Sequence, residues 1–403
     1  MIVAALRDPM RRNVGLLSGC FALVVTGNVL LVSVTALVGY ELAGDKSLAT
    51  LPAALMWAGT AAATVPASFL MRRIGRRAGF MAGALIGVLG ASLAAFAVTA
   101  GSFALLCLGV AIIGAYNGFC YYLRFAASEI ANDEFRSRAI ALVMAGGVVA
   151  ALAGPAIATA ANDLFAAAYM GPFLAIAGLA GLVFLLAAFI DVPRPQAIEL
   201  RGGRRLGQVM RQPVFVVAAL GGATAYGVMV LMMSITPLAM VSRAFSFGDA
   251  AFVIQWHVLG MFAPSFFTGH LIRRFGVLTV MGAGAAAMLA TTAVAVSGTA
   301  MLNFWLAMTL LGLGWNFLFI GGTTLLTEAY SVAERAKTQA VNEFMVFGAA
   351  GLGSFLSGNL HYYVGWETLN LAAIPPLLAV LAATLWLARR RRRAAYGAGS
   401  AAD

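Results

Sequence analysis

Twelve apolar stretches, each long enough to cross a lipid bilayer as a helix, constrain this chain more than any other feature of its sequence. A helix needs about 20 mainly apolar residues to span the hydrocarbon core. The chain is 62% hydrophobic with a mean hydropathy of +0.92, outside the range of water-soluble proteins. We therefore predict an all-α membrane protein with twelve transmembrane helices, at roughly 13–38, 51–71, 78–100, 102–128, 137–162, 169–190, 213–240, 248–272, 276–298, 301–328, 336–361 and 364–388.

The basic residues indicate how these helices are oriented. All but three of the 26 Lys and Arg fall in segments on one side of the predicted spans; the exceptions are Lys46, Arg124 and Arg243. Because cytoplasmic loops are rich in Lys and Arg, both termini are expected in the cytoplasm. The net charge of +11 is therefore explained by topology and contact with the lipid bilayer, and nucleic acid is not an expected partner.

Two related halves make up the chain. The segment Ser68-Phe-Leu-Met-Arg-Arg-Ile-Gly75 recurs as Gly269-His-Leu-Ile-Arg-Arg-Phe-Gly276, and Asn117 recurs as Asn316. A constant offset of roughly 200 residues indicates a duplicated six-helix unit. We predict an N-terminal six-helix bundle at 1–190, a cytoplasmic linker at 191–212, and a C-terminal six-helix bundle with a basic tail at 213–403.

The repeated loop resembles that of the major facilitator superfamily. Arg73, Gly75, Arg76 and Arg77 fit the family pattern, whereas Ser68 stands where the family has Gly, and Arg72 where it has Asp. The resemblance implies two pseudo-symmetric six-helix bundles that alternate around a central substrate site. It also implies a transporter rather than an enzyme, with no prosthetic group, and a monomer.

Two consecutive spans carry soft metal ligands at one helical turn, Met229-x-x-x-Met233 and His257-x-x-x-Met261. Residues four apart lie on the same helix face. Thioether and imidazole groups suit Cu(I), and they are uncharged, which lowers the cost of burying a site in the membrane. Counting from the centre of each span, Met229 and His257 lie at similar depth, Met233 lies farther toward the periplasm and Met261 nearer the middle.

The same two spans resemble those of the CcoA-type copper importers of this superfamily. The family's metal ligands match Met229, Met233, His257 and Met261. The resemblance implies import of copper, as Cu(I), for cytochrome oxidase assembly, with copper chaperones as partners on either side of the membrane.

Other functions stay open at this point. The branch includes riboflavin transporters, so riboflavin or another organic solute is the alternative substrate, and drug or metal efflux is a third. A membrane factor that binds copper without transporting it would carry the same ligands. Methionine is also common in apolar cores, and a chain with 18 Met gives an MxxxM pair easily by chance.

Ionisable groups at membrane depth are functional candidates by default. We expect Arg124 and Glu129 to form ion pairs between helices or bundles, and Glu343 to be the protonation site if transport is proton-coupled. A further set of polar and aromatic side chains either lines the central cavity or packs helices together: Asn28, Asn117, Asn316, Tyr121, Tyr122 and Trp315.

Overall fold

The computed structural model describes residues 8–45, 48, 51–162, 164–165, 169–193 and 203–399, and all regular structure within these ranges is helical. These residues group into two compact units. The described part of Met1–Gly202 forms the first unit together with Val332–Gly351, and Gly203–Ser331 with the described part of Leu352–Asp403 forms the second. Residues 194–202 of the predicted linker lie outside the described ranges.

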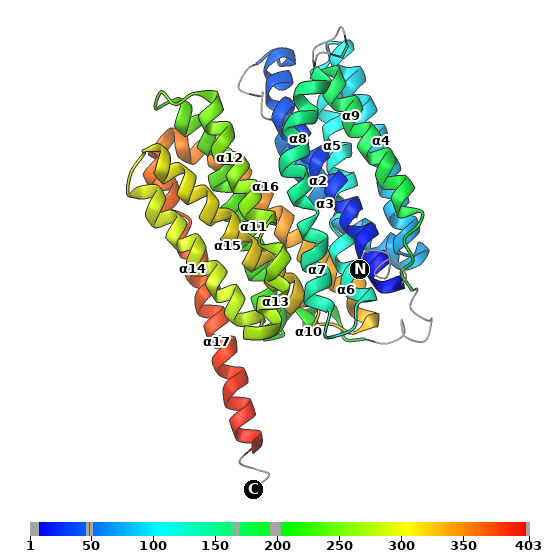
Figure 1. Ribbon diagram of the computed structural model, residues 1–403, viewed down its shortest axis with the longest axis vertical. Coiled ribbons are helices and arrows are strands. Elements are labelled where there is room, and N and C mark those ends of the chain that lie inside the picture. The colour runs from blue at the N-terminus through cyan, green and yellow to red at the C-terminus, as the bar shows by residue number, and fades with distance from the viewer. Residues whose placement is uncertain are drawn as a thin grey trace. The chain divides into compact units, whose positions relative to one another are not determined.

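The described residues of 8–193 form eight consecutive helices, which correspond to six spans, two of them broken. Helix α5 packs against α3 and α4, α4 also packs against α9, and α2 packs against α8 and α9. These helices are α2 (Pro9–Leu42), α3 (Leu51–Ile74), α4 (Arg76–Thr99), α5 (Phe103–Cys120), α6 (Leu123–Ile130), α7 (Arg136–Ala145), α8 (Gly147–Asn162) and α9 (Met170–Ala187) (Figure 1).

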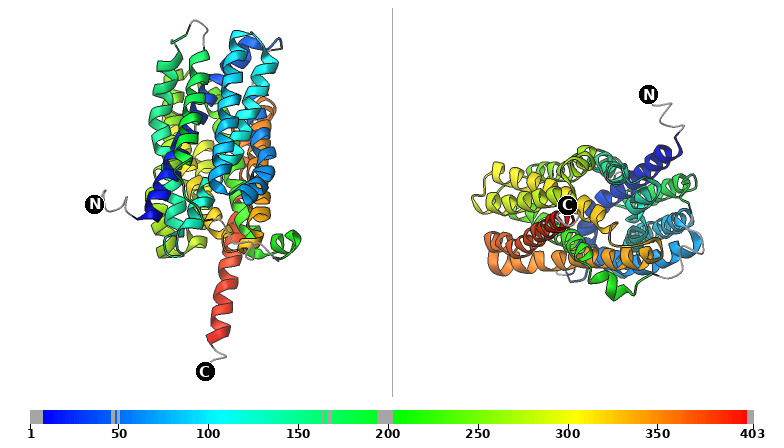
Figure 2. Two further views of the ribbon diagram at one scale, coloured as in Figure 1. Left: turned by 90° about the vertical axis from the view of Figure 1, so that its right-hand side faces the viewer. Right: turned by 90° about the horizontal axis from the view of Figure 1, so that it is seen from below.

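The second unit is organised around α15, which packs against α11, α12 and α14. Its helices are α10 (Leu206–Met210), α11 (Pro213–Val241), α12 (Phe247–Phe262), α13 (Ser265–Phe275), α14 (Val277–Val296), α15 (Met301–Leu326) and α17 (Ile374–Gly399). The short 3-10 helix η2 (Val332–Glu334) precedes α16 (Arg335–Leu371), which runs from the first unit into the second. The basic end of α17 extends past the other helices of its unit (Figure 2).

Among the described residues, eleven helices or helix runs are long and apolar enough to span a membrane, and a bent pair, Gly248–Phe262 with Ser265–Phe275, makes up a twelfth. The predicted split between the last two spans also has a structural counterpart. It lies at Gly365, whose φ of +79° interrupts α16. The twelve-span prediction therefore agrees with the structure.

The repeated loop has the same backbone conformation in both halves. Gly75, between α3 and α4, has φ 88° and ψ 164°, and Gly276, between α13 and α14, has φ 86° and ψ 149°. This region is open essentially only to glycine. In each case the backbone amide of the glycine donates to the carbonyl oxygen four residues earlier, of Met71 or Ile272. This single residue therefore ends one helix and allows the next to begin.

Helix α16 has residues in both compact units. The sequence assigns all of 336–361 to the C-terminal bundle, whereas contacts group Val332–Gly351 with the first unit. Within the first unit, Arg335, Gln339 and Glu343 of this helix bond side chains of α4 and α6.

Candidate functional site

His257 is fully buried on α12, and its two ring nitrogens have different surroundings. Nδ1 lies 2.9 Å from the carbonyl oxygen of Met308 on α15. Because a carbonyl oxygen can only accept, Nδ1 carries the proton of the neutral ring and Nε2 carries the lone pair. Nε2 is buried with no hydrogen-bond partner among the described residues. A metal-binding histidine takes this form when a carbonyl fixes its other nitrogen.

The backbone around His257 is held against α15 by a glycine and an amide. A Cβ atom at Gly312 would collide with the backbone at His257 and Met261, so only glycine permits this approach. One turn along, Asn316 donates from Nδ2 to the carbonyl oxygen of Met261 and to Ser265 Oγ, both at 2.6 Å. Asn316 therefore pairs backbone and side-chain groups left at the break between α12 and α13.

The methionine pair lies on a face of α11 that also carries Thr236, a residue in contact with α15. Met229 is buried and Met233 is half-buried. Thr236 lies on nearly the same helix face, seven residues after Met229. Its Oγ1 is 3.4 Å from Sδ of Met308, the residue whose carbonyl bonds His257.

Met308, which the sequence did not single out, contacts both helices that carry the predicted ligands, through Thr236 on α11 and His257 on α12. His257 and Met261, which is 7% exposed, lie one turn apart on α12. Thr236, on the α11 face that carries Met229, contacts Met308. No spacing pattern marks Met308, because its position matters only once α15 contacts both α11 and α12.

An ion pair is buried in the first unit. Both partners, Arg124 on α6 and Glu343 on α16, are 1% or less exposed, and Arg124 NH2 lies 2.6 and 2.7 Å from the two carboxylate oxygens. Arg124 NH1 also donates to the carbonyl oxygen of Tyr121, and Asn342 donates to Glu343 Oε1. Arg124 on α6 therefore forms its ion pair with Glu343 on α16.

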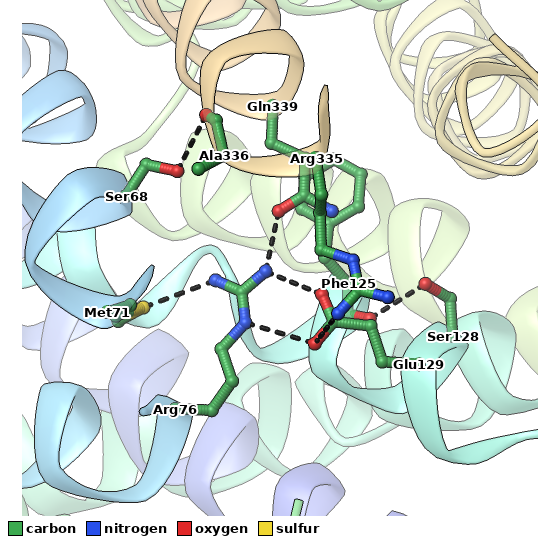
Figure 3. Close-up of polar contacts among 9 residues, drawn as sticks. All are labelled: Ser68, Met71, Arg76, Phe125, Ser128, Glu129, Arg335, Ala336 and Gln339. Atoms are coloured by element: carbon green, nitrogen blue, oxygen red, sulfur yellow. Dashed lines mark hydrogen bonds and ion pairs between the residues drawn. The ribbon is translucent and has the colours of Figure 1, made fainter. Parts of the chain in front are cut away.

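Glu129 forms a second charged cluster with two arginines. Arg76 approaches its carboxylate from α4 at 2.5 Å, and Arg335 approaches from α16 at 3.2 Å (Figure 3). Arg76 NH2 also donates to Gln339 Oε1 at 2.6 Å. Gln339 was missed at the sequence level, although its position four residues before Glu343 places both on one face of α16.

The arginines of the predicted loop motif differ in burial. Arg76 is buried in the Glu129 cluster, whereas Arg73 and Arg77 are exposed. Ser68, which replaces the usual glycine, donates from Oγ to the carbonyl oxygen of Ala336 at 2.8 Å, as Figure 3 shows. The departure from the family pattern therefore adds a hydrogen bond between α3 and α16.

A third polar cluster joins amides to aromatic rings in the first unit. Asn117 Nδ2 donates to Asn28 Oδ1 at 2.8 Å, and Asn28 Nδ2 lies 3.5 Å from the hydroxyl of Tyr121. The ring of Tyr121 lies 4.5 Å from that of Phe347, which stacks on Trp57 at 6.3 Å between centroids. Trp57 and Phe347 carried no sequence signal, because their meeting depends on α3 and α16 being brought together.

Comparison with known proteins identifies the family. The model of the Major Facilitator Superfamily matches residues 16–264 and 224–402. The chain is a member of the major facilitator superfamily. It is thus a membrane-embedded secondary transporter and not an enzyme, as the loop motif predicted.

Relatives extend over nearly the whole chain. The riboflavin transporter RfnT of Brucella anthropi is 40% identical over 376 residues, which is 92% of this chain and 94% of that protein. The uncharacterised transporter YdeG of Bacillus subtilis is 30% identical, over 87% of this chain and 85% of its own.

Solved structures share the fold at low sequence identity. The transporter FucP in its outward conformation gives a TM-score of 0.75 at 18% identity, covering 96% of this chain and 99% of that chain. A bacterial homologue of the iron transporter ferroportin gives 0.70 at 14% identity, covering 92% and 98%. These likenesses establish the all-helical fold.

Proposed function

We propose that this protein imports riboflavin, or a flavin of closely similar structure, across the bacterial inner membrane. The observation that carries the proposal is the 40% identity to a riboflavin transporter over 92% of the chain and 94% of the relative. The fold itself says little about the substrate, since one fold supports many functions. Copper, the substrate that the sequence pattern favoured, becomes the second candidate.

The arrangement of polar groups is compatible with a flavin. A flavin is a flat, largely apolar ring system with hydrogen-bonding atoms along one edge, and such ligands bind between aromatic side chains and a few placed polar groups. The Asn28, Asn117 and Tyr121 cluster, with Trp57 and Phe347 beside it, supplies both kinds of group.

Radiolabelled riboflavin uptake by a riboflavin-auxotrophic bacterial host tests this proposal. Cells expressing the protein should accumulate label with time and grow at low external riboflavin, whereas cells with the empty vector should do neither. Excess unlabelled riboflavin should abolish accumulation. Expression of inserted protein without accumulation above the empty vector would exclude riboflavin as a substrate.

Copper import is the second candidate because of one specific observation, the buried and unpartnered Nε2 of His257. In this proposal Met233, Met229 and His257 accept Cu(I) from the periplasmic side and Met261 receives it nearer the midplane. Neutral imidazole and thioethers are suitable ligands. The cytoplasmic orientation of both termini belongs to the same proposal and follows from the basic loops.

Substitution of His257 separates the copper proposal from a packing role. His257→Gln retains a donor for the Met308 carbonyl but lacks the imidazole nitrogen. Cu(I) affinity, measured in detergent by competition with a chelator, should fall by more than the about 10- to 100-fold that loss of an outer-shell partner costs. The matched control is His270→Gln, because His270 is exposed on α13.

Equal Cu(I) affinity in both histidine variants and the unmodified protein would remove His257 from the ligand set. Uptake of radioactive copper into proteoliposomes then distinguishes transport from binding alone. A membrane factor that only binds copper would bind a fixed amount without accumulation over time.

A further inference from the structure

Asn117 has an unused hydrogen-bonding atom inside the first unit. Its side chain is 1% exposed, and Nδ2 donates to Asn28 Oδ1. Its Oδ1 is buried without a hydrogen-bond partner among the described residues. A buried amide oxygen normally has a partner, because leaving it unpaired forfeits its hydration. This oxygen therefore retains an unused capacity to accept a hydrogen bond.

The corresponding residue of the second half shows that this is not a general property of the repeat position. Asn316 donates to Met261 and Ser265, and its Oδ1 accepts from Thr268 Oγ1 at 2.6 Å. Both Nδ2 and Oδ1 of Asn316 are therefore bonded, and they join α15 to the break between α12 and α13. The repeat thus has a fully bonded structural amide in one half and an amide with a free acceptor in the other.

The neighbours of Asn117 place donors and aromatic faces beside that acceptor. Asn28 Nδ2 lies 3.5 Å from the Tyr121 hydroxyl, at the long limit of a hydrogen bond, so this amide can also donate to a closer acceptor. The rings of Tyr121 and Trp57 both pack against that of Phe347, at 4.5 and 6.3 Å between centroids. Asn28 and Trp57 are half-buried, whereas Asn117 and Phe347 are buried, which gives the cluster an accessible side.

We propose that Asn117, Asn28 and Tyr121 bind the imide edge of a flavin ring whose face packs on Tyr121 and Trp57; this rests on the proposed riboflavin transport. That edge presents one N–H between two carbonyl oxygens. Asn117 Oδ1 accepts the N–H, and the Asn28 amide and Tyr121 hydroxyl donate to a neighbouring carbonyl oxygen. The cluster therefore determines specificity for flat rings that carry a donor flanked by acceptors.

Competition by an analogue methylated at the imide nitrogen tests the assignment. Labelled riboflavin uptake into proteoliposomes is measured against unlabelled riboflavin and against N3-methylriboflavin. The unmodified protein should prefer riboflavin by roughly tenfold, the factor that one such hydrogen bond gives. Asn117→Leu, of similar size but without the acceptor, should bind both flavins with the same weakened affinity.

A second variant covers the case in which Asn117→Leu fails to insert. Asn28→Ala should weaken the affinity for riboflavin by a similar factor. It should keep the preference for riboflavin over the N3-methyl analogue, because Asn117 Oδ1 remains. Asn303→Ala is the control, since Asn303 bonds only Ser297 and Val294 at a helix end in the hydrogen bonds described. It should behave as the unmodified protein.

Two failures are distinguishable. If the unmodified protein takes up riboflavin but both unlabelled flavins compete equally well for uptake, the imide assignment is overturned and riboflavin transport stands. If it takes up no riboflavin at all, the proposed function fails, and the assignment fails with it.

Discussion

At the scale of single residues, the polar side chains within these apolar helices divide by whether all their bonding atoms are used. Asn316 is fully bonded, whereas His257 and Asn117 each retain one buried atom without a partner among the described residues. In an apolar interior an unpaired atom is costly, so it persists where function needs it or where packing leaves no choice. The experiments on these two residues distinguish those explanations.

Arg124 and Glu343 should stabilise the folded protein only when both side chains are present. Glu343→Gln leaves the buried Arg124 charge without its partner, which should lower the free energy of unfolding by about 3–5 kcal/mol. Arg124→Gln with Glu343→Gln should restore much of that loss, because the uncompensated charge is gone. Thermal unfolding in detergent, read as a double-mutant cycle, measures both.

Glu328→Gln is the matched control for this cycle. Glu328 pairs with Arg391 at 2.6 Å, but both side chains are about two-fifths exposed. An exposed pair contributes about 0–1 kcal/mol, so the unfolding temperature should barely change. Equal effects from the buried and exposed changes would show that burial does not determine the contribution of the Arg124 pair.

At the scale of elements, the helices are as informative where they break as where they continue. The spans are interrupted at Tyr121–Tyr122, at Gly146 and at Pro264, and each break lies near a polar side chain with a bonding role. Ser18 donates to the Leu142 carbonyl beside the second break, and Asn316 bonds the third. The breaks are stabilised because freed backbone groups find side-chain partners.

The glycine of the repeated loop should be required for its backbone conformation alone. A Cβ atom at Gly276 meets nothing within 4 Å, so Gly276→Ala introduces only backbone strain at φ 86°. Strain in this region costs about 1–3 kcal/mol, and the unfolding temperature in detergent should fall accordingly. Gly178→Ala is the control, because Gly178 is inside α9 with equally free space, and alanine there favours the helix. A similar response from both variants would argue against strain at Gly276.

At the scale of the whole molecule, the positive-inside pattern predicts the orientation in the membrane. Arg243, exposed at the end of α11, should face the periplasm, and Arg390 on α17 should face the cytoplasm. In a background with Cys20, Cys107 and Cys120 replaced by serine, a membrane-impermeant maleimide should label Arg243→Cys in right-side-out vesicles and Arg390→Cys only in inverted ones. The reverse labelling would invert the predicted topology.

The sequence by itself determined the fold class, because twelve apolar stretches in a bilayer can satisfy their backbone groups only as helices. It also identified the superfamily, since the loop motif of Arg73, Gly75, Arg76 and Arg77 depends on local backbone geometry that one short segment encodes. It named Met229, Met233, His257 and Met261 from spacing, which reports a shared helix face but not what that face meets.

Only the tertiary structure decided which polar groups are partners. Arg124 pairs with Glu343, 219 residues away, and Arg76 and Arg335 share Glu129. Asn117 and Asn316 are equivalent by sequence repeat but differ in surroundings. Asn316 lies beside the break between α12 and α13, whereas Asn117 lies beside the amide of Asn28. Hydrogen bonds and ion pairs depend on contact within a few ångströms, and such contacts between distant segments arise only when the helices pack.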